Sequence, residues 1–531
     1  MRNELPLPVK GGIILAALQG LILPVPALAR DKKAPKRLNI IHIMSDDHSY
    51  QAISAYGHPL SAHAPTPNMD RLASEGIRFD RAYVENSLST PSRACLMTGL
   101  YSHQNGQRTL GKGIDSTVTF VTELLQGGGY QTAVVGKWHM QCEPKGFDYY
   151  YILRGQGEYY NPVFKSHLSG GKYEQEDGYV TSLVTEHAID FLENRDPDKP
   201  FCLYVHHKSP HRNWMPDVRY LDLYEDVEFP LPETFSDDYS TKGEAAREQR
   251  MTIDKDMTLI YDLKIGELEK EPTRAGHAAG LERGLARMDP ETREKWDNAY
   301  GPRNRDFLEG GLEGDDLLKW KYQRYIRDYL RCIRSVDDSV GEILEYLDSH
   351  GLAENTIVVY TSDQGFYMGE HGWFDKRFMY EESFRTPLII RYPGGPCGIA
   401  SEAFVQNLDF APTYLDAAGL DVPEEMSGRS LLPVIRHRGR QPLLWRKYMY
   451  YHYYDLPSEH NVLKHDGVSD KRYKLIHFYG GKDGDYSEFY DLRKDPSEMH
   501  NCFGDKRYRR QIARLQRRLD KFRRDLRVDE W

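Results

Sequence analysis

Oxygen-bearing side chains follow two apolar runs of the sequence, close to the point where each run ends. Asp46 and Asp47 come after "NIIHIM", and Asp363 and Gln364 come after "TIVVYTS". Ligands of open parallel sheets bind beyond the carboxyl ends of the strands, so we expect these side chains to lie together. Carboxylate and amide oxygens without a thiol or an obligatory imidazole suit Ca²⁺ or Mg²⁺ better than Zn²⁺. Either pair alone would fit a solvated turn or a helix cap, but two acidic strand ends favour a cation site.

Basic side chains follow two further apolar runs. Lys137 and His139 come after "QTAVVG", and Lys208 and His211 come after "FCLYVHH". A single lysine or histidine is usually a surface or structural residue. Lys137, His139 and His211 gain importance because they occupy predicted strand ends beside the acidic pairs. A metal ion next to several cations forms a site for a tetrahedral oxyanion, whose charge is spread over several oxygens.

The stretch "LSTPSRACLMTG" at residues 88–99 predicts a helix whose start can bind an anion. Pro91 suits the first turn of a helix, and the free N–H groups and dipole of a helix start attract negative charge. Arg93 adds a permanently charged donor with several N–H groups. Ser89 lies where a nucleophile would sit, but its hydroxyl is weak without an adjacent base. Cys95 lies about a turn and a half beyond Pro91, and we expect it to pack beneath the helix.

The elements that position these residues follow from the apolar runs. Four runs rich in β-branched residues, at 38–44, 131–136, 201–207 and 355–362, are apolar on both faces and predict buried strands. Amphipathic segments separate them, and the clearest is a helix over residues 322–351. Buried strands alternating with helices predict an α/β fold with a mainly parallel sheet.

The composition changes along the rest of the chain. Residues 217–317 are polar and predict an insertion of loops and short helices. Beyond residue 440, aromatic runs separated by turns predict a small antiparallel sheet. A last helix has one apolar stripe and many arginines, which we interpret as a solvated face rather than a polyanion-binding face. We therefore predict a catalytic domain at residues 36–435 and a C-terminal subdomain at residues 436–531.

Charge and cysteine content exclude several classes of function. The 531 residues carry a formal net charge of −10, which argues against nucleic acid as a partner. The hydrophobic content of 40% with 28% charged residues is typical of globular proteins. The six cysteines include no CxxC pair, which excludes the usual structural zinc patterns. Disulfides remain open, because the sequence cannot pair these cysteines.

The first 29 residues resemble a signal peptide. Two early cations precede an apolar stretch at residues 11–24, and small residues at 27–29 fit a cleavage site. The stretch is short for a membrane span, so export to the periplasm or the medium is favoured over anchoring. No later segment has the apolar length that stable membrane insertion needs.

Residues 89–93, "STPSR", resemble the maturation signature (C/S)-x-P-x-R of type I sulfatases, in which the first residue is oxidised to formylglycine. The segments "IIHIMSDDHS", "GKWHM", "HHKSPHR", "YTSDQGFYMGEHGWFDKR" and "FRTPLIIRYPG" also resemble sulfatase segments in the family's order. The resemblance runs from about residue 38 to residue 501. It implies an alkaline-phosphatase-like fold, with a large mixed, mainly parallel sheet flanked by helices and a smaller C-terminal antiparallel subdomain.

The resemblance also implies a nucleophile and a metal site. Ser89 would become formylglycine (3-oxoalanine), whose hydrate attacks sulfur. Asp46, Asp47, Asp363 and Gln364 would bind Ca²⁺, which also contacts the modified Ser89. A weak serine then suffices, because the nucleophile is no longer a serine hydroxyl. Serine in place of cysteine implies maturation by a radical-SAM sulfatase-maturating enzyme.

Five basic residues take family roles by the same resemblance. Arg93 and Lys137 would support the formylglycine and its charge, and His139 would orient the hydrate. His211 would be the general acid that protonates the leaving oxygen, and Lys376 would bind sulfate. Together these residues imply hydrolysis of a sulfate ester.

The segment "HGWFDKRFMYEESFRTP" resembles glucosamine-6-O-sulfatases that act on heparan-type and related glycosaminoglycan fragments. This implies that Asp375 and Arg377 contact sugar hydroxyls, which a carboxylate and a guanidinium can satisfy together. A structural ion pair beside Lys376 remains an equal alternative. His465 matches a position written H-Y-G-I-R-T in this subgroup, which makes it a further candidate substrate-binding residue, although different residues follow it here. Residues 155–162 either line the same pocket or form a structural loop.

The leading hypothesis is an exported sulfatase that removes a sulfate ester from a carbohydrate, and the 6-O-sulfate of N-acetylglucosamine is the expected substrate group. One alternative is another sugar specificity, such as galactosamine or uronic acid sulfate. A second is a phosphonate or phosphate monoester hydrolase of the same superfamily, since sulfate and phosphate are isosteric. A third is a glycan-binding protein without turnover, if Ser89 is not matured.

Overall fold

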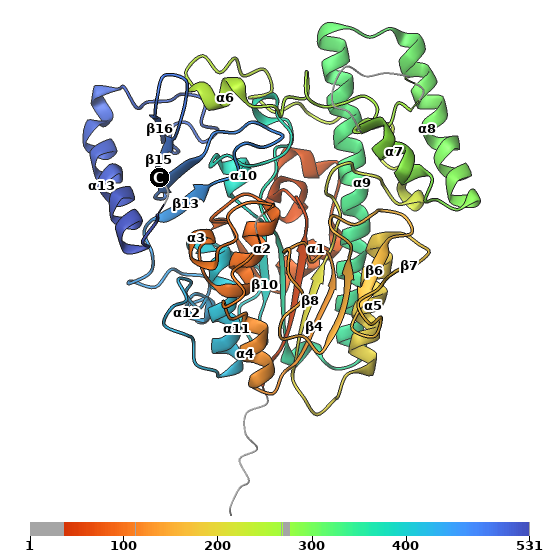
Figure 1. Ribbon diagram of the computed structural model, residues 1–531, viewed down its shortest axis with the longest axis vertical. Helices are drawn as coiled ribbons and strands as arrows, with labels where there is room; N and C mark the ends of the chain where they lie inside the picture. Colours follow the sequence, from red (N-terminus) through yellow and green to blue (C-terminus); the bar gives the residue numbers. More distant parts are fainter. Residues whose placement is uncertain (1–36, 112, 267, 269–276, 530–531) are drawn as a thin grey trace, which may run out of the picture. The chain divides into compact units, whose positions relative to one another are not determined.

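The computed structural model describes residues 37–529 except 112, 267 and 269–276 (Figure 1). The predicted signal peptide at residues 1–29 lies outside the described residues. Arg37–Trp531 form one compact unit. The proposed boundary between residues 435 and 436 therefore stays a prediction. No helix in the described ranges has both the length and the apolar character needed to cross a membrane.

A mixed sheet of ten strands forms the centre of this unit, as the sequence predicts. From one edge to the other its strands are β11 (Ile399–Ser401), β2 (Ile77–Phe79), β10 (Leu388–Arg391), β9 (Thr356–Ser362), β1 (Asn39–Ser45), β8 (Phe201–His206), β4 (Gln131–Gly136), β5 (Tyr149–Leu153), β6 (Val163–Ser166) and β7 (Tyr173–Gln175). The five central strands β9, β1, β8, β4 and β5 are parallel, and antiparallel strands flank them.

The register of the central strands brings their carboxyl ends to one edge. Ser45 of β1 pairs with Ser362 of β9, and Met44 pairs with His206 of β8. Gly136 of β4 also pairs with His206. All four of these strands were predicted from their apolar runs, and every residue of β1 and β9 is buried. The polar residues that follow them must therefore meet beyond the same edge.

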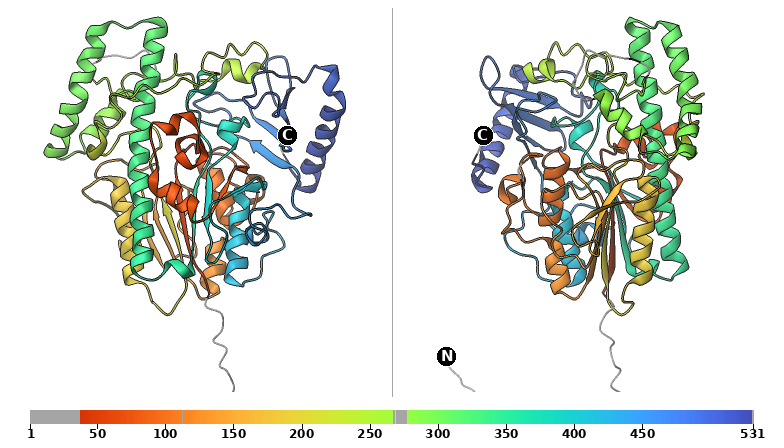
Figure 2. Two further views of the ribbon diagram at one scale, coloured as in Figure 1. Left: turned by 180° about the vertical axis from the view of Figure 1, so that it is seen from behind. Right: turned by 45° about the vertical axis from the view of Figure 1, so that its right-hand side comes forward.

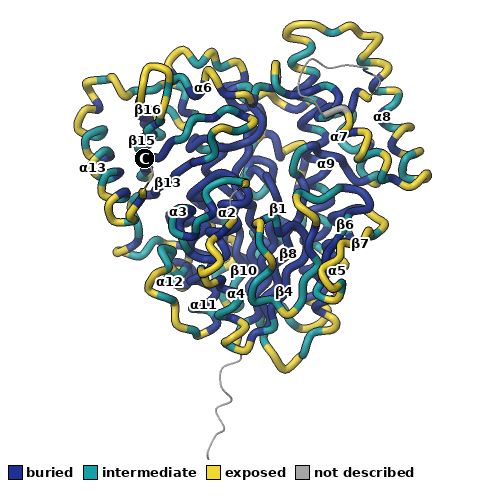
Figure 3. The backbone as a smooth tube through the Cα atoms, in the orientation of Figure 1, coloured by how far each residue is buried: buried dark blue, intermediate teal, exposed yellow. Residues whose placement is uncertain are grey.

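Helices cover both faces of the sheet (Figure 2). The helices are α1 (Pro67–Ser74), α2 (Ser89–Thr98), α3 (Ser102–Asn105), α4 (Val121–Gly127), α5 (Val180–Asn194), α6 (Glu244–Glu248), α7 (His277–Leu285), α8 (Pro290–Gly310), α9 (Gly314–Ser349), α10 (Glu381–Phe384), α11 (Phe410–Ala418), α12 (Leu432–Arg436) and α13 (Arg509–Asp525). Ile41 and Ile43 of β1 face the core under α1, α5 and α9. Ile40 and Met44 face the opposite core, under α2, α4 and α11. The sheet is thus buried on both sides (Figure 3).

Two helices are longer than the sequence indicated. α9 begins at Gly314 rather than at residue 322, because a polar first turn with Asp315 and Asp316 extends the amphipathic part. α8 has 21 residues and lies in the segment predicted to hold loops and short helices. Its interior contains Pro302, which is unfavourable in a helix, and its sequence gives little apolar periodicity.

The C-terminal part forms the predicted antiparallel sheet. Its four strands are β13 (Met449–Tyr453), β14 (His465–Ser469), β15 (Tyr473–Phe478) and β16 (Tyr486–Asp491), in that order. α13 packs on it through Leu515 and Leu519, and most of its arginines face outward. Arg523 is an exception, since it is 6% exposed and donates to Asp466 at 2.7 and 2.8 Å. The short strands β3 (Ala82–Tyr83) and β12 (Val405–Gln406) form a separate parallel pair.

Candidate active site

Three carboxylates and one amide meet at the carboxyl edge of the sheet. Asp46 and Asp47 follow β1, and Asp363 and Gln364 follow β9. The backbone N–H of Asp47 donates to Asp363 Oδ1 at 3.1 Å, and the Gln364 amide donates to Asp47 Oδ1. Each of these four residues is at most 1% exposed. The structure therefore brings together the four residues predicted as cation ligands.

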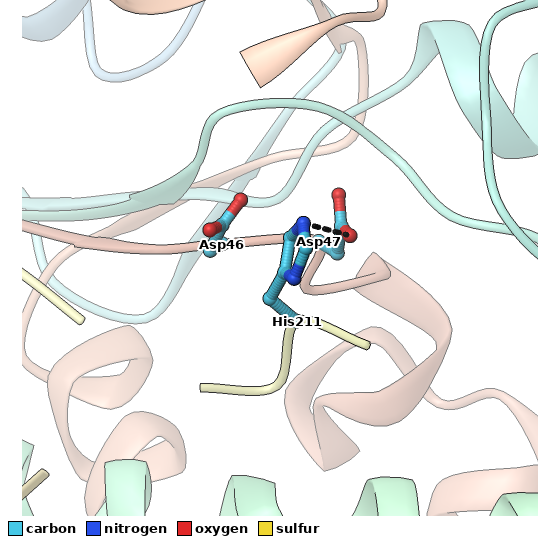
Figure 4. Close-up of side chains that lie close together, drawn as sticks. All are labelled: Asp46, Asp47 and His211. Atoms are coloured by element: carbon cyan, nitrogen blue, oxygen red, sulfur yellow. Dashed lines mark ion pairs between the residues drawn. The ribbon is translucent and has the colours of Figure 1, made fainter. Parts of the chain in front are cut away.

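The chemistry of this group fits a divalent cation. The Gln364 Oε1 atom is buried without a hydrogen-bond partner. Burial raises the pKa of Asp47 to about 6 and that of Asp363 to about 7, and the neighbouring Asp46 charge adds to both shifts. Ligand atoms of Asp46, Asp47 and His211 lie within 4.8 Å of one another (Figure 4). Converging carboxylate and amide oxygens form the donor set of a hard cation such as Ca²⁺.

Ser89 lies at the start of α2 and points to this group. Its Oγ donates to Asp46 Oδ1 at 3.2 Å. The helix begins at Ser89, two residues before the predicted start at Pro91, because Leu88 is extended and acts as the N-cap. Pro91 is tolerated at the third position, since the N–H groups of the first turn have no intrahelical acceptor. Cys95 is fully buried as predicted, and its thiol donates to Glu85 Oε1 at 2.6 Å.

Arg93 and Lys137 bind two of the carboxylates. Arg93 donates to Asp363 Oδ2 from Nη2 at 3.0 Å and from Nε at 3.2 Å, and its Nη1 donates to the Lys137 carbonyl at 2.7 Å. The Lys137 ammonium donates to Asp46 Oδ2. Burial opposes ionisation of Asp46, but the positive charges of Lys137 and Arg93 hold its pKa well below its usual range. Asp46 is therefore ionised at neutral pH.

A glycine allows Lys137 to reach this position. Gly136 has a φ of 95°, and a Cβ atom there would lie 2.0 Å from the His206 carbonyl oxygen. Only glycine fits where β4 approaches β8 so closely. The chain then turns Lys137 toward Asp46.

The two predicted histidines face the group from different loops. His139 Nδ1 lies 3.2 Å from Thr90 Oγ1, beside the start of α2. Burial and the nearby Lys137 lower the pKa of His139 to about 3, so the ring is neutral. His211 Nδ1 donates to the Arg212 carbonyl at 2.7 Å, and its Nε2 lies 3.8 Å from Asp47 Oδ2. The hydrogen bond at Nδ1 leaves Nε2 as the nitrogen that faces the reaction site.

Lys376 completes the positive side of the site. Its ammonium donates to both Asp47 oxygens, at 2.7 and 2.8 Å. Asp375 and Arg377 flank it and form an ion pair at 2.9 Å, which agrees with the structural alternative. Both, however, have left-handed backbone conformations, with φ of 79° and 96°. Such conformations cost about 1–3 kcal/mol each and concentrate at functional sites, which favours a role beyond the ion pair.

A histidine that the sequence did not reveal contacts this pair. His460 Nε2 lies 3.3 Å from Asp375 Oδ2, and His460 Nδ1 donates to the Arg250 carbonyl at 2.7 Å. Burial opposes ionisation of Asp375, but His460, Lys376 and Arg377 hold its pKa well below its usual range. The contact joins segments far apart in the chain, so no local pattern could have predicted it.

The structure places His465 in the aromatic core rather than at the surface of a cleft. The residue is fully buried, its ring lies 4.8 Å from Phe478 and 5.4 Å from Tyr453, and its Nδ1 donates to the Leu463 carbonyl at 2.8 Å. Pairing of His465 with Tyr453 in the C-terminal sheet turns its ring inward. Tyr453 Oη lies 3.3 Å from Arg377 Nη1. His465 therefore contacts Tyr453, and Tyr453 contacts a residue of the predicted sugar site.

A cleft of about 690 Å³ opens beside His211. Residues 155–162, for which a pocket-lining or a structural role was open, contribute Gln156, Glu158 and Tyr159 to its wall. Lys208 lines the same cleft, although no role was predicted for it. The site can thus hold a divalent cation and a tetrahedral anion, and it offers a histidine where a leaving group could depart.

Comparisons with known proteins agree with this chemistry. A family model described as "Sulfatase" matches residues 38–420, and one described as "N-sulphoglucosamine sulphohydrolase, C-terminal" matches residues 369–525. The chain is 48% identical over 510 residues to an N-acetylglucosamine-6-O-sulfatase of Bacteroides thetaiotaomicron, covering 94% of this chain and 90% of that protein.

Solved structures confirm the predicted fold class. A structure in complex with its substrate D-glucosamine-2-N,6-O-disulfate has a TM-score of 0.88 and 47% identity, covering 93% of this chain and 99% of that chain. The phosphonate monoester hydrolase of Agrobacterium radiobacter has a TM-score of 0.65 and 21% identity, covering 92% and 96%, and shows the fold alone. Since the sulfatase model spans more than half of the sequence and a relative with 48% identity covers most of it, the chain belongs to the sulfatase family.

Proposed function

We propose that this sulfatase hydrolyses the 6-O-sulfate ester of N-acetylglucosamine and related glucosamine residues in glycosaminoglycan-derived saccharides. The observation that carries the proposal is the left-handed pair Asp375 and Arg377 beside Lys376, which offers a carboxylate and a guanidinium to sugar hydroxyls. The 48% identity to an N-acetylglucosamine-6-O-sulfatase supports this choice of sugar. The disulfated glucosamine bound as substrate in the structure with 47% identity supports it as well.

The proposal assigns the two groups that sulfatases require to residues of this chain. Asp46, Asp47, Asp363 and Gln364 would hold Ca²⁺, which would polarise a sulfate oxygen and offset the buried carboxylates. Ser89, oxidised to formylglycine by a radical-SAM maturating enzyme, would supply as its hydrate the oxygen that attacks sulfur. The position of Ser89 Oγ, 3.2 Å from Asp46 Oδ1, supports both assignments.

Three basic residues supply positive charge in the proposed reaction. Arg93 and Lys137 keep Asp363 and Asp46 paired and supply positive charge at the start of α2. Lys376 lies at the metal group with three N–H donors, where it can neutralise a sulfate oxygen. Their arrangement favours a transition state with negative charge spread over several oxygens.

Two histidines have different proposed roles, one as the general acid and one in orienting the nucleophile. His211 Nε2 faces the cleft side of the metal group and would protonate the leaving sugar oxygen. Burial and Lys137 lower the pKa of His211 well below its usual range, and the charge of a bound sulfate would oppose this shift. His139, neutral and beside Thr90, would orient the hydrated side chain of residue 89.

We assign sugar recognition to the two residues that flank Lys376 in the chain. Asp375 and Arg377 would bind hydroxyls, while His460 and Tyr453 hold the pair in place. His465 would support Tyr453 from the core rather than contact the sugar. We also propose export of the protein, on the signal-peptide pattern of its first 29 residues.

Sulfate release from defined saccharides tests this function. Protein co-expressed with a serine-type maturating enzyme should desulfate N-acetylglucosamine-6-O-sulfate and N-sulfoglucosamine-6-O-sulfate. It should act at least about 100-fold less well on galactosamine-6-O-sulfate, because one inverted hydroxyl leaves buried polar groups unpaired. Ser89→Ala is the inactive control. Preference for a galactosamine or uronic acid sulfate, or faster release of phosphate from sugar phosphates, would overturn the proposal.

A further inference from the structure

Lys208 is a buried cation that faces the cleft beside His211. It follows β8, is 5% exposed, and lines the cleft wall. Its ammonium lies 4.7 Å from the centre of the Tyr159 ring and 3.3 Å from the Gln156 carbonyl oxygen. Across the described residues, no carboxylate oxygen comes within 4.0 Å of it. Its near neighbours are therefore a ring face and one carbonyl, while the charges of Asp46 and Glu158 act on it from farther away.

Two other buried lysines in the described ranges each have a carboxylate partner. Lys264 pairs with Asp328 at 2.8 Å, and Lys474 pairs with Glu498 at 2.8 Å. Burying a charge is costly unless an opposite charge compensates it. Burial, with a further contribution from Lys137, lowers the pKa of Lys208 to about 8. The protein carries this cost at the edge of its active site, where an incoming anion could remove it.

The charges around Lys208 favour an anion in the same space. Arg154 and Arg212, which also line the cleft, are already paired with carboxylates at 3.0 and 2.6 Å. Arg287 donates to the Tyr160 carbonyl at 3.1 Å, and its guanidinium lies beyond 4.0 Å of every carboxylate oxygen in the described ranges. Lys208 and Arg287 therefore give this wall positive charge that has no ion-pair partner within 4.0 Å among the described residues.

The cleft also connects Lys208 to the reaction site. His211 lines it, and the positive charge of Lys208 contributes to the lowered pKa values of His211 and His139. A saccharide whose leaving oxygen lies at His211 could therefore place a further part of its structure in the cleft that Lys208 lines. The reacting sulfate has its own cation in Lys376, and Lys137 pairs with Asp46, so Lys208 is available to another group.

We propose that Lys208 is a specificity-determining residue that binds a second anionic group of the saccharide, a sulfate or a carboxylate, while the 6-O-sulfate is hydrolysed. The inference rests on the proposed function. Two sources share this chemistry: a 2-N-sulfate on the same glucosamine, and the carboxylate of an adjoining uronic acid. Lys208 then raises kcat/KM for substrates that carry a second anionic group.

The experiment measures kcat/KM of the matured protein on three substrates. These are N-acetylglucosamine-6-O-sulfate, N-sulfoglucosamine-6-O-sulfate, and a uronic acid disaccharide of N-acetylglucosamine-6-O-sulfate. For one of the two doubly anionic substrates, Lys208→Met should lower the ratio of its kcat/KM to that of N-acetylglucosamine-6-O-sulfate. The expected decrease is about 10- to 100-fold, the range of a charge-assisted hydrogen bond. The substrate whose preference falls identifies the source of the anion. Lys208→Arg should retain most of the preference.

Matched measurements separate recognition from folding. Lys199→Met removes the same charge from a side chain that is 58% exposed, and it should leave every preference within about 2-fold. Thermal unfolding of Lys208→Met should occur at the wild-type temperature or above, because an unpaired buried charge is removed. Parallel losses on all three substrates, or unchanged preferences, would overturn the role of Lys208. Wild-type protein inactive on all three would instead refute the proposed function and the inference with it.

Discussion

His211→Asn tests the assignment of the general acid, and the structure predicts its effect on two kinds of substrate. The change removes Nε2, which lies 3.8 Å from Asp47 Oδ2, while an amide N–H can still reach the Arg212 carbonyl. Loss of that hydrogen bond would cost about 1 kcal/mol of stability at most. The variant should therefore stay folded, so that kinetic effects report on proton transfer.

The magnitude follows from the leaving group. A sugar alkoxide is a poor leaving group, and a positioned general acid contributes about 10²- to 10⁴-fold to its departure. We expect kcat on glucosamine-6-O-sulfates to fall by that factor, which corresponds to about 3–5 kcal/mol of activation free energy. An aryl sulfate releases a stable phenolate that needs no proton, so its kcat should fall by less than about 10-fold.

The assay compares kcat on a sugar sulfate with kcat on aryl sulfates of graded phenol acidity. His437→Ala is the control, because His437 is exposed and its Nδ1 also contacts a backbone carbonyl, that of Pro433 at 2.6 Å. The control should match wild type on every substrate. Equal losses on sugar and aryl substrates in His211→Asn would refute the general-acid role and would favour His211 as a metal ligand.

Three further predictions concern the metal group, sugar recognition and stability. Chelation should abolish activity and lower the unfolding temperature, since Ca²⁺ would bind the folded arrangement of Asp46, Asp47 and Asp363, and added Ca²⁺ should restore both; full activity after chelation would contradict the metal site. Asp375→Ala should lower kcat/KM on glucosamine sulfates by about 10- to 100-fold and spare small aryl sulfates, whereas equal losses would make the residue structural. Burial raises the pKa of Glu85 from 4.5 to about 7, so its contribution to stability is full below pH 4.5 and is lost as the pH rises through 7. Glu85→Gln should thus be more stable than wild type at pH 8, by up to about 3 kcal/mol in urea unfolding; identical pH profiles from 4.5 to 8 would exclude this.

The sequence predicted which residues lie at the carboxyl edge of the sheet, because the pattern that indicates them is local in the chain. The runs before Asp46, Lys137, His211 and Asp363 are apolar on both faces, which identifies buried parallel strands. Parallel strands place the residues that follow them at one edge, so their side chains meet without any further information.

What the sequence did not predict depends on tertiary contacts. β14 is short and contains Gly467, where a Cβ atom would lie 2.3 Å from Met379 Sδ, so packing rather than propensity makes it a strand. The same pairing turns His465 into the core. His460 and Lys208 depend on partners distant in the chain, and no spacing rule reports such contacts.

The mass of the peptide that contains Ser89, measured on active protein, shows directly whether residue 89 carries formylglycine. We predict that this peptide is lighter than its sequence mass by one hydrogen molecule, as oxidation of the serine to formylglycine requires. Sulfate release should rise in proportion to the modified fraction. Full sulfatase activity in protein whose Ser89 peptide has the unmodified mass would show that formylglycine at this position is not the nucleophile.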